Sequence, residues 1–292
     1  MDLIYITHPL NGIIMIILPV ALALYLTRHF KTGWKLFLIG AATFVLSQLG
    51  HIPFNYLLTL LFQRGVLPTP PEQFELIFRA VILGLSAGLW EEAARYASYR
   101  WWAKDARTWG RALVFGSGHG GLEAIILGLL VLITFIQMVG LRTMDLSTVI
   151  PPEQLATAQQ QVETYWNLSW YDTLLGSIER ISALAFHLSA SVIVLQCFIR
   201  KQIRWLGFAI LWHALLDAVA VYSIEMWGAY VAEGLIGVLG LASIAIIFIL
   251  KTPEPDADEK QDLPPVMDAS SLKPAPEFVE EDAELLEKTR YN

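Results

Sequence analysis

The sequence predicts an all-α membrane protein, a polytopic bundle of about seven transmembrane helices. Of its 292 residues 55% are hydrophobic and only 16% are charged, and apolar runs long enough to cross a bilayer recur over the first 250 residues. So few charged residues cannot cover the surface of a soluble globule of this size. A single cysteine, Cys197, excludes an intrachain disulfide and any zinc site built on cysteines. We expect the lipid bilayer as a partner and no nucleic-acid partner.

The first two apolar runs cover about residues 12–26 and 34–62. No basic segment precedes the first run and no small-residue cleavage pattern follows it, which favours a retained span over a signal peptide. Pro53 is expected to interrupt the second run, because proline lacks a backbone donor and kinks helices. Three polar residues lie at helical spacing in this run and are expected to serve helix packing: Gln48, His51 and Asn55.

Five further spans are expected, at about residues 74–98, 112–138, 178–198, 206–223 and 227–250. The one long polar connection, 141–171, contains a glutamine-rich segment that should form a short surface helix, and it closes with aromatic residues typical of a membrane interface. From Lys251 the composition turns to Pro, Asp, Glu and Lys, as in disordered tails. The expected organisation is therefore a membrane domain over residues 1–250 and an acidic tail over 251–292.

Basic residues predict the orientation in the membrane. They gather in the connections after the first, third and fifth spans: Arg28, Lys31, Lys35, Arg100, Lys104, Arg107, Arg111, Arg200, Lys201 and Arg204. The opposite connections carry mainly Arg64 and Arg142. By the positive-inside rule the N-terminus faces out and the tail faces the cytoplasm. We expect the chain in the cell membrane of a prokaryote.

The third span carries two adjacent carboxylates and an arginine, in the stretch Glu91-Glu92-x-x-Arg95. Charged side chains at membrane depth are costly, so three together require partners or a function. Three other spans each bring one histidine: His119, His187 and His213. At ~1.5 Å of helix rise per residue, these positions fall roughly 10 to 20 Å below the same membrane surface. We therefore expect the acids and the imidazoles to meet at one site.

These residue types fit metal-assisted hydrolysis. Imidazole nitrogens and carboxylate oxygens are the usual ligands of catalytic zinc, and a nearby glutamate can move the proton of a bound water. His213 and Asp217 lie four residues apart, as do His119 and Glu123, so each pair shares a helix face. Arg95 can hold one glutamate and leave the other free to act. Two glycine pairs predict close helix packing: Gly84 with Gly88, and Gly116 with Gly120.

The stretches Glu91-Glu92-x-x-Arg95, Phe115-x-x-x-His119 and His213-x-x-x-Asp217, with a histidine in the span between the last two, resemble the motifs of the CPBP superfamily of intramembrane proteases. That superfamily includes the CAAX prenyl endopeptidases and the PrsW proteases, and the branch most similar to this sequence is the YhfC family of membrane metallopeptidases. The resemblance covers spans three to six, about half of the chain. It implies a CAAX-protease-like helical core.

The resemblance also implies an activity, the hydrolysis of a peptide bond in a membrane-associated protein or peptide. It implies that one glutamate of the pair Glu91 and Glu92 is the general base, and that His119, His213 and Asp217 bind the metal or the water. Arg95 completes the expected catalytic residues, and the residue types make zinc the expected metal. The arginine follows the first glutamate by four residues where the CAAX-type pattern has five, so either glutamate remains a candidate base.

Plainer interpretations stay open beside this one. His187 and Glu123 are further candidate metal ligands, but His187 could instead donate a hydrogen bond between helices, and Glu123 could neutralise Arg180 or a neighbouring histidine. His213 and Asp217 could form a neutral structural pair. At the level of function, a non-catalytic scaffold related to the superfamily and an ion-coupled transporter are the alternatives, since buried acids and histidines also form ion pathways. The sequence shows no internal duplication of the kind that many transporters carry.

Overall fold

The computed structural model describes residues 3–253 and is built from α-helices, with no strand within that range. The helices are α1 (Ile4–His29), α2 (Lys35–Gln63), α3 (Glu75–Trp101), α4 (Trp109–Thr143), α5 (Pro152–Trp166), α6 (Leu175–Ile199), α7 (Arg204–Trp227) and α8 (Ala229–Ile249). Seven of these are long and apolar enough to cross a membrane, all but α5. The seven-span, all-α prediction is therefore confirmed. The predicted tail lies outside the described residues from Glu254 onward.

Two features of the helices differ from the sequence-based expectation or add to it. The predicted interruption at Pro53 was wrong, because α2 runs through this residue as one helix. Membrane helices tolerate proline where neighbouring helices satisfy the freed backbone groups. Helix α4 has 35 residues, which gives a length of about 50 Å, well beyond the ~30 Å apolar layer of a bilayer. Its last turn meets the polar helix α5, where the guanidinium of Arg142 lies 4.7 Å from the ring centre of Trp166.

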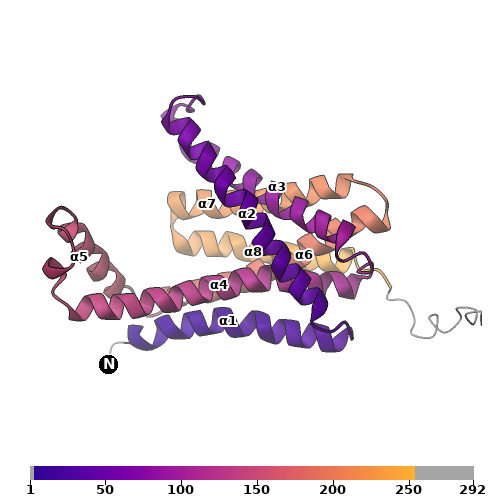
Figure 1. The fold of residues 1–292 in the computed structure, drawn as a ribbon, viewed down its shortest axis with the longest axis horizontal. Helices are drawn as coiled ribbons and strands as arrows, with labels where there is room; N and C mark the ends of the chain where they lie inside the picture. Colours follow the sequence, from indigo (N-terminus) through magenta and orange to yellow (C-terminus); the bar gives the residue numbers. More distant parts are fainter. Residues whose placement is uncertain (1–2, 254–292) are drawn as a thin grey trace, which may run out of the picture. The chain divides into compact units, whose positions relative to one another are not determined.

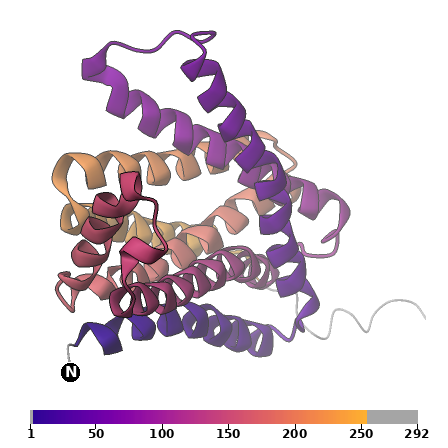
Figure 2. The same cartoon turned by 60° about the vertical axis from the view of Figure 1, so that its left-hand side comes forward.

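Helix α4 organises the packing. It lies against α1, α2 and α6, while α3 packs on α7 and α8 on α6. Figure 1 shows α1 and α4 side by side, and both views show the α2–α3 hairpin diverging from α4 towards the connection between residues 63 and 75 (Figures 1 and 2). Helix α6 is the most enclosed span, with 72% of its apolar window buried. The functional candidates therefore project from α3, α4 and α7 towards a buried central helix.

The outer surface of the bundle is apolar. Large hydrophobic side chains that remain exposed occur on every spanning helix, for example Ile17, Leu49, Leu85, Ile136, Ile181, Leu211 and Leu241. A soluble protein rarely exposes apolar area on this scale, whereas lipid favours it. The surface thus supports an integral membrane protein in contact with a bilayer.

Glycines set the two helix contacts that carry the site. On α3, a Cβ atom added at Gly84 would lie 2.4 Å from the carbonyl oxygen of Ala214 on α7, and one at Gly88 would lie 2.6 Å from that of Ile210. On α4, Gly116 and Gly120 face α6 in the same way, with His187 as their neighbour. The close packing predicted for both glycine pairs is confirmed: α3 lies directly against the backbone of α7, and α4 lies against the backbone of α6 and the side chains of Ser191 and His187.

We expect Gly84→Ala to lower the free energy of unfolding by about 1–3 kcal/mol, because the added methyl group must push two helix backbones apart. Thermal unfolding of the purified protein in detergent measures the change. The matched control is Gly237→Ala on α8, where an added Cβ meets nothing within 4 Å. Equal melting temperatures for the two variants would show that α3 and α7 are not held by this contact.

Candidate active site

Four helices bring five titratable side chains together inside the protein. Glu91 and Glu92 come from α3, His119 from α4, His187 from α6 and His213 from α7, and all five are buried. The ring centres of His119 and His187 are 5.2 Å apart, and those of His187 and His213 are 5.9 Å apart. The residues that the sequence placed at a common depth thus lie in one cluster.

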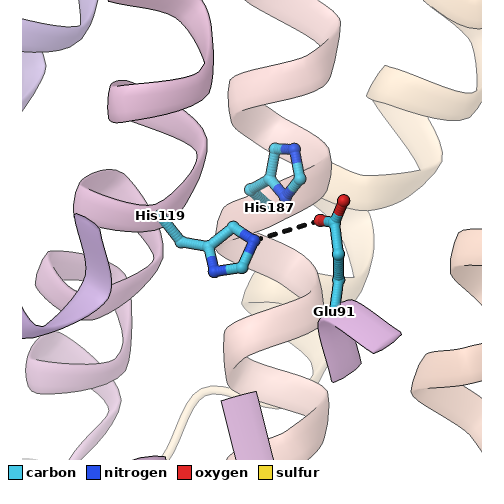
Figure 3. Close-up of side chains that lie close together, drawn as sticks. All are labelled: Glu91, His119 and His187. Carbon is cyan, nitrogen blue, oxygen red and sulfur yellow. Dashed lines mark hydrogen bonds and ion pairs between the residues drawn. The ribbon is translucent and has the colours of Figure 1, made fainter. Parts of the chain in front are cut away.

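Glu91 lies at the centre of this cluster. Its Oε2 is 3.1 Å from Nε2 of His119 and 3.9 Å from Nε2 of His213. Figure 3 shows the carboxylate of Glu91 facing the His119 ring, with His187 beside them on the next helix. Its other oxygen, Oε1, accepts a hydrogen bond of 3.0 Å from the side-chain amide of Gln48 on α2. One oxygen of Glu91 is therefore anchored to α2, and the other faces the histidines.

Glu92 is engaged differently. Nη1 of Arg95 lies 3.2 Å from both of its oxygens, and Nδ1 of His213 lies 2.8 Å from Oε1. The side chains of Glu92 and Arg95 are both 0% exposed. The arginine thus holds Glu92, the second glutamate of the pair, and Glu91 keeps an oxygen directed at the centre of the cluster.

His187 and Glu123 make further ionic contacts at the cluster. Glu123 Oε2 lies 2.7 Å from Nε2 of His187, and Glu123 Oε1 lies 2.7 Å from Nη1 of Arg180. The other ring nitrogen of His187, Nδ1, is 3.3 Å from Nη2 of Arg95. The sequence analysis offered Arg180 or a neighbouring histidine as partners that Glu123 could neutralise. In the structure Glu123 contacts both Arg180 and a histidine, His187.

Asp217 lies at the margin of the cluster. Its Oδ2 is 3.6 Å from Nε2 of His213, which is outside hydrogen-bond distance. The side chains of Asp217 and Glu123 are 31% and 22% exposed, against 8% for Glu91. Both acids lie one helical turn beyond the histidine on their own helix, so they mark the accessible side of the cluster.

The donor set fits a divalent cation. Glu91, His119 and His187 each offer one ligand atom, and these atoms lie within 4.8 Å of one another. Nitrogen and carboxylate donors suit zinc. His119 Nδ1 is buried and has no hydrogen-bond partner among the described residues, which is unusual for a buried imidazole. The contact of Glu92 with Nδ1 of His213 is of the kind that fixes the ring orientation of a metal-binding histidine.

The sequence interpretation assigned Gln48 to helix packing and gave it no contact with the site. In the structure its amide touches Glu91 directly. The available signal was the helical spacing of Gln48, His51 and Asn55, which places three polar side chains on one face of α2. The spacing could not show that this face turns towards α3.

Comparison with known proteins identifies the family of the chain. A family model described as "YhfC intramembrane metalloprotease" matches residues 14–250. A curated relative, "Uncharacterized membrane protein YhfC" of Bacillus subtilis (strain 168), is 31% identical over 248 residues, which cover 83% of this chain and 93% of that protein. No solved structure matches the chain. The family match runs from within α1 to the end of α8, and the chain belongs to the YhfC intramembrane metalloprotease family.

Proposed function

We propose that the protein is an intramembrane metalloendopeptidase that hydrolyses a peptide bond of a membrane-associated protein or peptide. The observation that carries this proposal is the carboxylate of Glu91, which is buried in a membrane-spanning helix with one oxygen 3.1 Å from His119. A carboxylate at that depth costs several kcal/mol unless it has partners, and such residues in membrane proteins usually mark functional sites. The family match supports the same reaction class.

Each side chain has a role in this proposal. Glu91 is the general base: Oε2 takes a proton from the attacking water and returns it to the leaving amine. His119, His187 and His213 would hold a zinc ion through ring nitrogens, with Asp217 beside them, so that the carboxylate of Glu91 stays free to act as the base. A bound zinc ion would supply a Lewis acid and bring the pKa of its water towards neutrality. Arg95 orients Glu92, and Glu92 in turn fixes His213 through Nδ1.

Glu123 and Arg180 have a positioning role. Glu123 accepts from Nε2 of His187 and from Arg180, so it fixes the ring of His187 from the side opposite to Arg95. This leaves the accessible face of the cluster, at Asp217 and Glu123, as the side from which a peptide substrate approaches.

The orientation and the domain limits belong to the same proposal. The basic connections α1–α2, α3–α4 and α6–α7 support an N-terminus outside the cell and an active site nearer the cytoplasmic surface. The membrane domain then covers residues 1–250, and residues 251–292 are a cytoplasmic segment.

The experiment is cleavage of a panel of fluorescent membrane-spanning peptides by the purified protein in liposomes. We expect cleavage that a chelator abolishes and zinc restores, and about one zinc per chain by elemental analysis. Zinc content should fall in His119→Ala and stay unchanged in the control His29→Ala, at the exposed end of α1. Chelator-resistant cleavage would remove the metal from the proposal. A zinc-loaded protein that cuts no member of the panel would favour the non-catalytic scaffold.

A further inference from the structure

A row of polar side chains on α2 ends at the proposed general base. Gln48, His51 and Asn55 follow one another at intervals of three and four residues, so they share one face of the helix. That face turns towards α3, where Ser86 lies 3.2 Å from Nε2 of His51 and Glu91 lies 3.0 Å from the amide nitrogen of Gln48. Three neutral polar residues at membrane depth need partners, and here they find them in one another and in Glu91.

The hydrogen bonds of this row have a single direction. Asn55 Nδ2 lies 2.9 Å from Nε2 of His51, and His51 Nδ1 lies 3.3 Å from Oε1 of Gln48. If Asn55 donates to Nε2, the histidine carries its proton on Nδ1 and donates it to Gln48. The amide oxygen of Gln48 then accepts, and its amide nitrogen donates to Glu91. Turning the Gln48 amide over would set its oxygen against a carboxylate oxygen, so an ionised Glu91 requires this direction of the row.

We propose that Gln48 is a positioning residue of the active site, which holds Oε1 of Glu91 so that Oε2 is the oxygen presented to His119. This inference rests on the proposed function of Glu91 as general base. His51 and Asn55 act through Gln48, because they fix the orientation of its amide. Asn55, at the far end of the row, lines a cavity of about 650 Å³ between α2 and α3. The hydrogen-bonded row therefore connects this cavity to Glu91.

The decisive variant is Gln48→Met, which keeps the length of the side chain and removes the donor. We expect kcat to fall about ten- to a hundredfold, the usual effect of losing a hydrogen bond to a charged group, with KM within about twofold because Gln48 does not touch the substrate. The control is the same change at Gln137, an exposed glutamine of α4. Zinc content should be unchanged in both variants. A kcat equal to that of the unmodified protein would overturn the proposal.

A second measurement does not depend on catalysis. The carboxylate stretching band of Glu91, identified by its absence in Glu91→Gln, should move to higher frequency in Gln48→Met, because a hydrogen bond to the carboxylate is lost. A protein that cuts no peptide but shows this shift would refute the proposed function and leave the contact established. A band that does not move would refute the inference itself, whatever the activity.

The serial order of the row gives a third test. We expect His51→Leu to lower kcat by less than Gln48→Met does, and the double variant to be no worse than Gln48→Met alone, because His51 acts only through Gln48. If the double variant instead loses kcat by the product of the two single factors, His51 acts on the site independently of Gln48. If Gln48→Met does not accumulate, Gln48→Leu removes the donor with another apolar side chain, and it must lower kcat by a similar factor.

Discussion

Glu91→Gln is expected to lower the rate of peptide cleavage by about 10²- to 10⁴-fold and to leave the melting temperature close to that of the unmodified protein. Glutamine has the shape of glutamate but cannot take a proton from water, so the base is lost. The fold should survive, because the substitution removes a buried charge and the amide can still meet Gln48 and His119. Initial rates on a cleavable membrane peptide, with thermal unfolding in parallel, measure both quantities.

The neighbouring glutamate gives the sharpest comparison. Glu92→Gln should lose stability as well as activity, because it leaves the buried guanidinium of Arg95 without its carboxylate and frees the ring of His213. Glu75→Gln, at the exposed start of α3, should change neither quantity. If instead Glu92→Gln stays stable and inactive while Glu91→Gln keeps its activity, the two glutamates have been assigned the wrong way round.

The fold was predictable from the sequence because lipid imposes a simple requirement on each span. About 20 apolar residues must follow one another, and the seven runs that meet this condition became the seven long helices. The glutamine-rich segment also became the surface helix α5. Pro53 shows where local chemistry misleads: proline in isolation breaks a helix, but the packing around α2, which the sequence does not reveal, decides whether the break occurs.

The sequence predicts which residues gather at the site better than it predicts which of their atoms contact one another. Depth along each helix follows from counting residues, so the gathering of Glu91, His119 and His213 could be foreseen. Which oxygen meets which nitrogen depends on the rotation of each helix about its own axis and on side-chain rotamers. From the sequence, either glutamate could be the ion-pair partner of Arg95. In the structure the partner is Glu92. The same rotation decides that Gln48 reaches Glu91.

Arg95 and Glu92 form the most enclosed ion pair among the described residues. Neither side chain is exposed, and the arginine also reaches Nδ1 of His187 on α6. Arg79, nearer the start of the same helix, forms a contrasting ion pair. It pairs with Glu225 of α7, and the two side chains are 47% and 48% exposed. Helix α3 thus carries one arginine in a buried ion pair and another in an exposed ion pair.

We expect Arg95→Met to lower the free energy of unfolding by about 3–5 kcal/mol, because the carboxylate of Glu92 stays buried after its counter-charge is gone. Arg79→Met, the same change at the exposed pair, should cost about 0–1 kcal/mol. Thermal unfolding in detergent compares them. Adding Glu92→Gln to Arg95→Met should recover part of the loss, since the orphaned charge is then removed, and a further decrease would contradict that cause. Such a recovery would show that the loss in Arg95→Met comes from the buried carboxylate of Glu92, whose charge the arginine compensates.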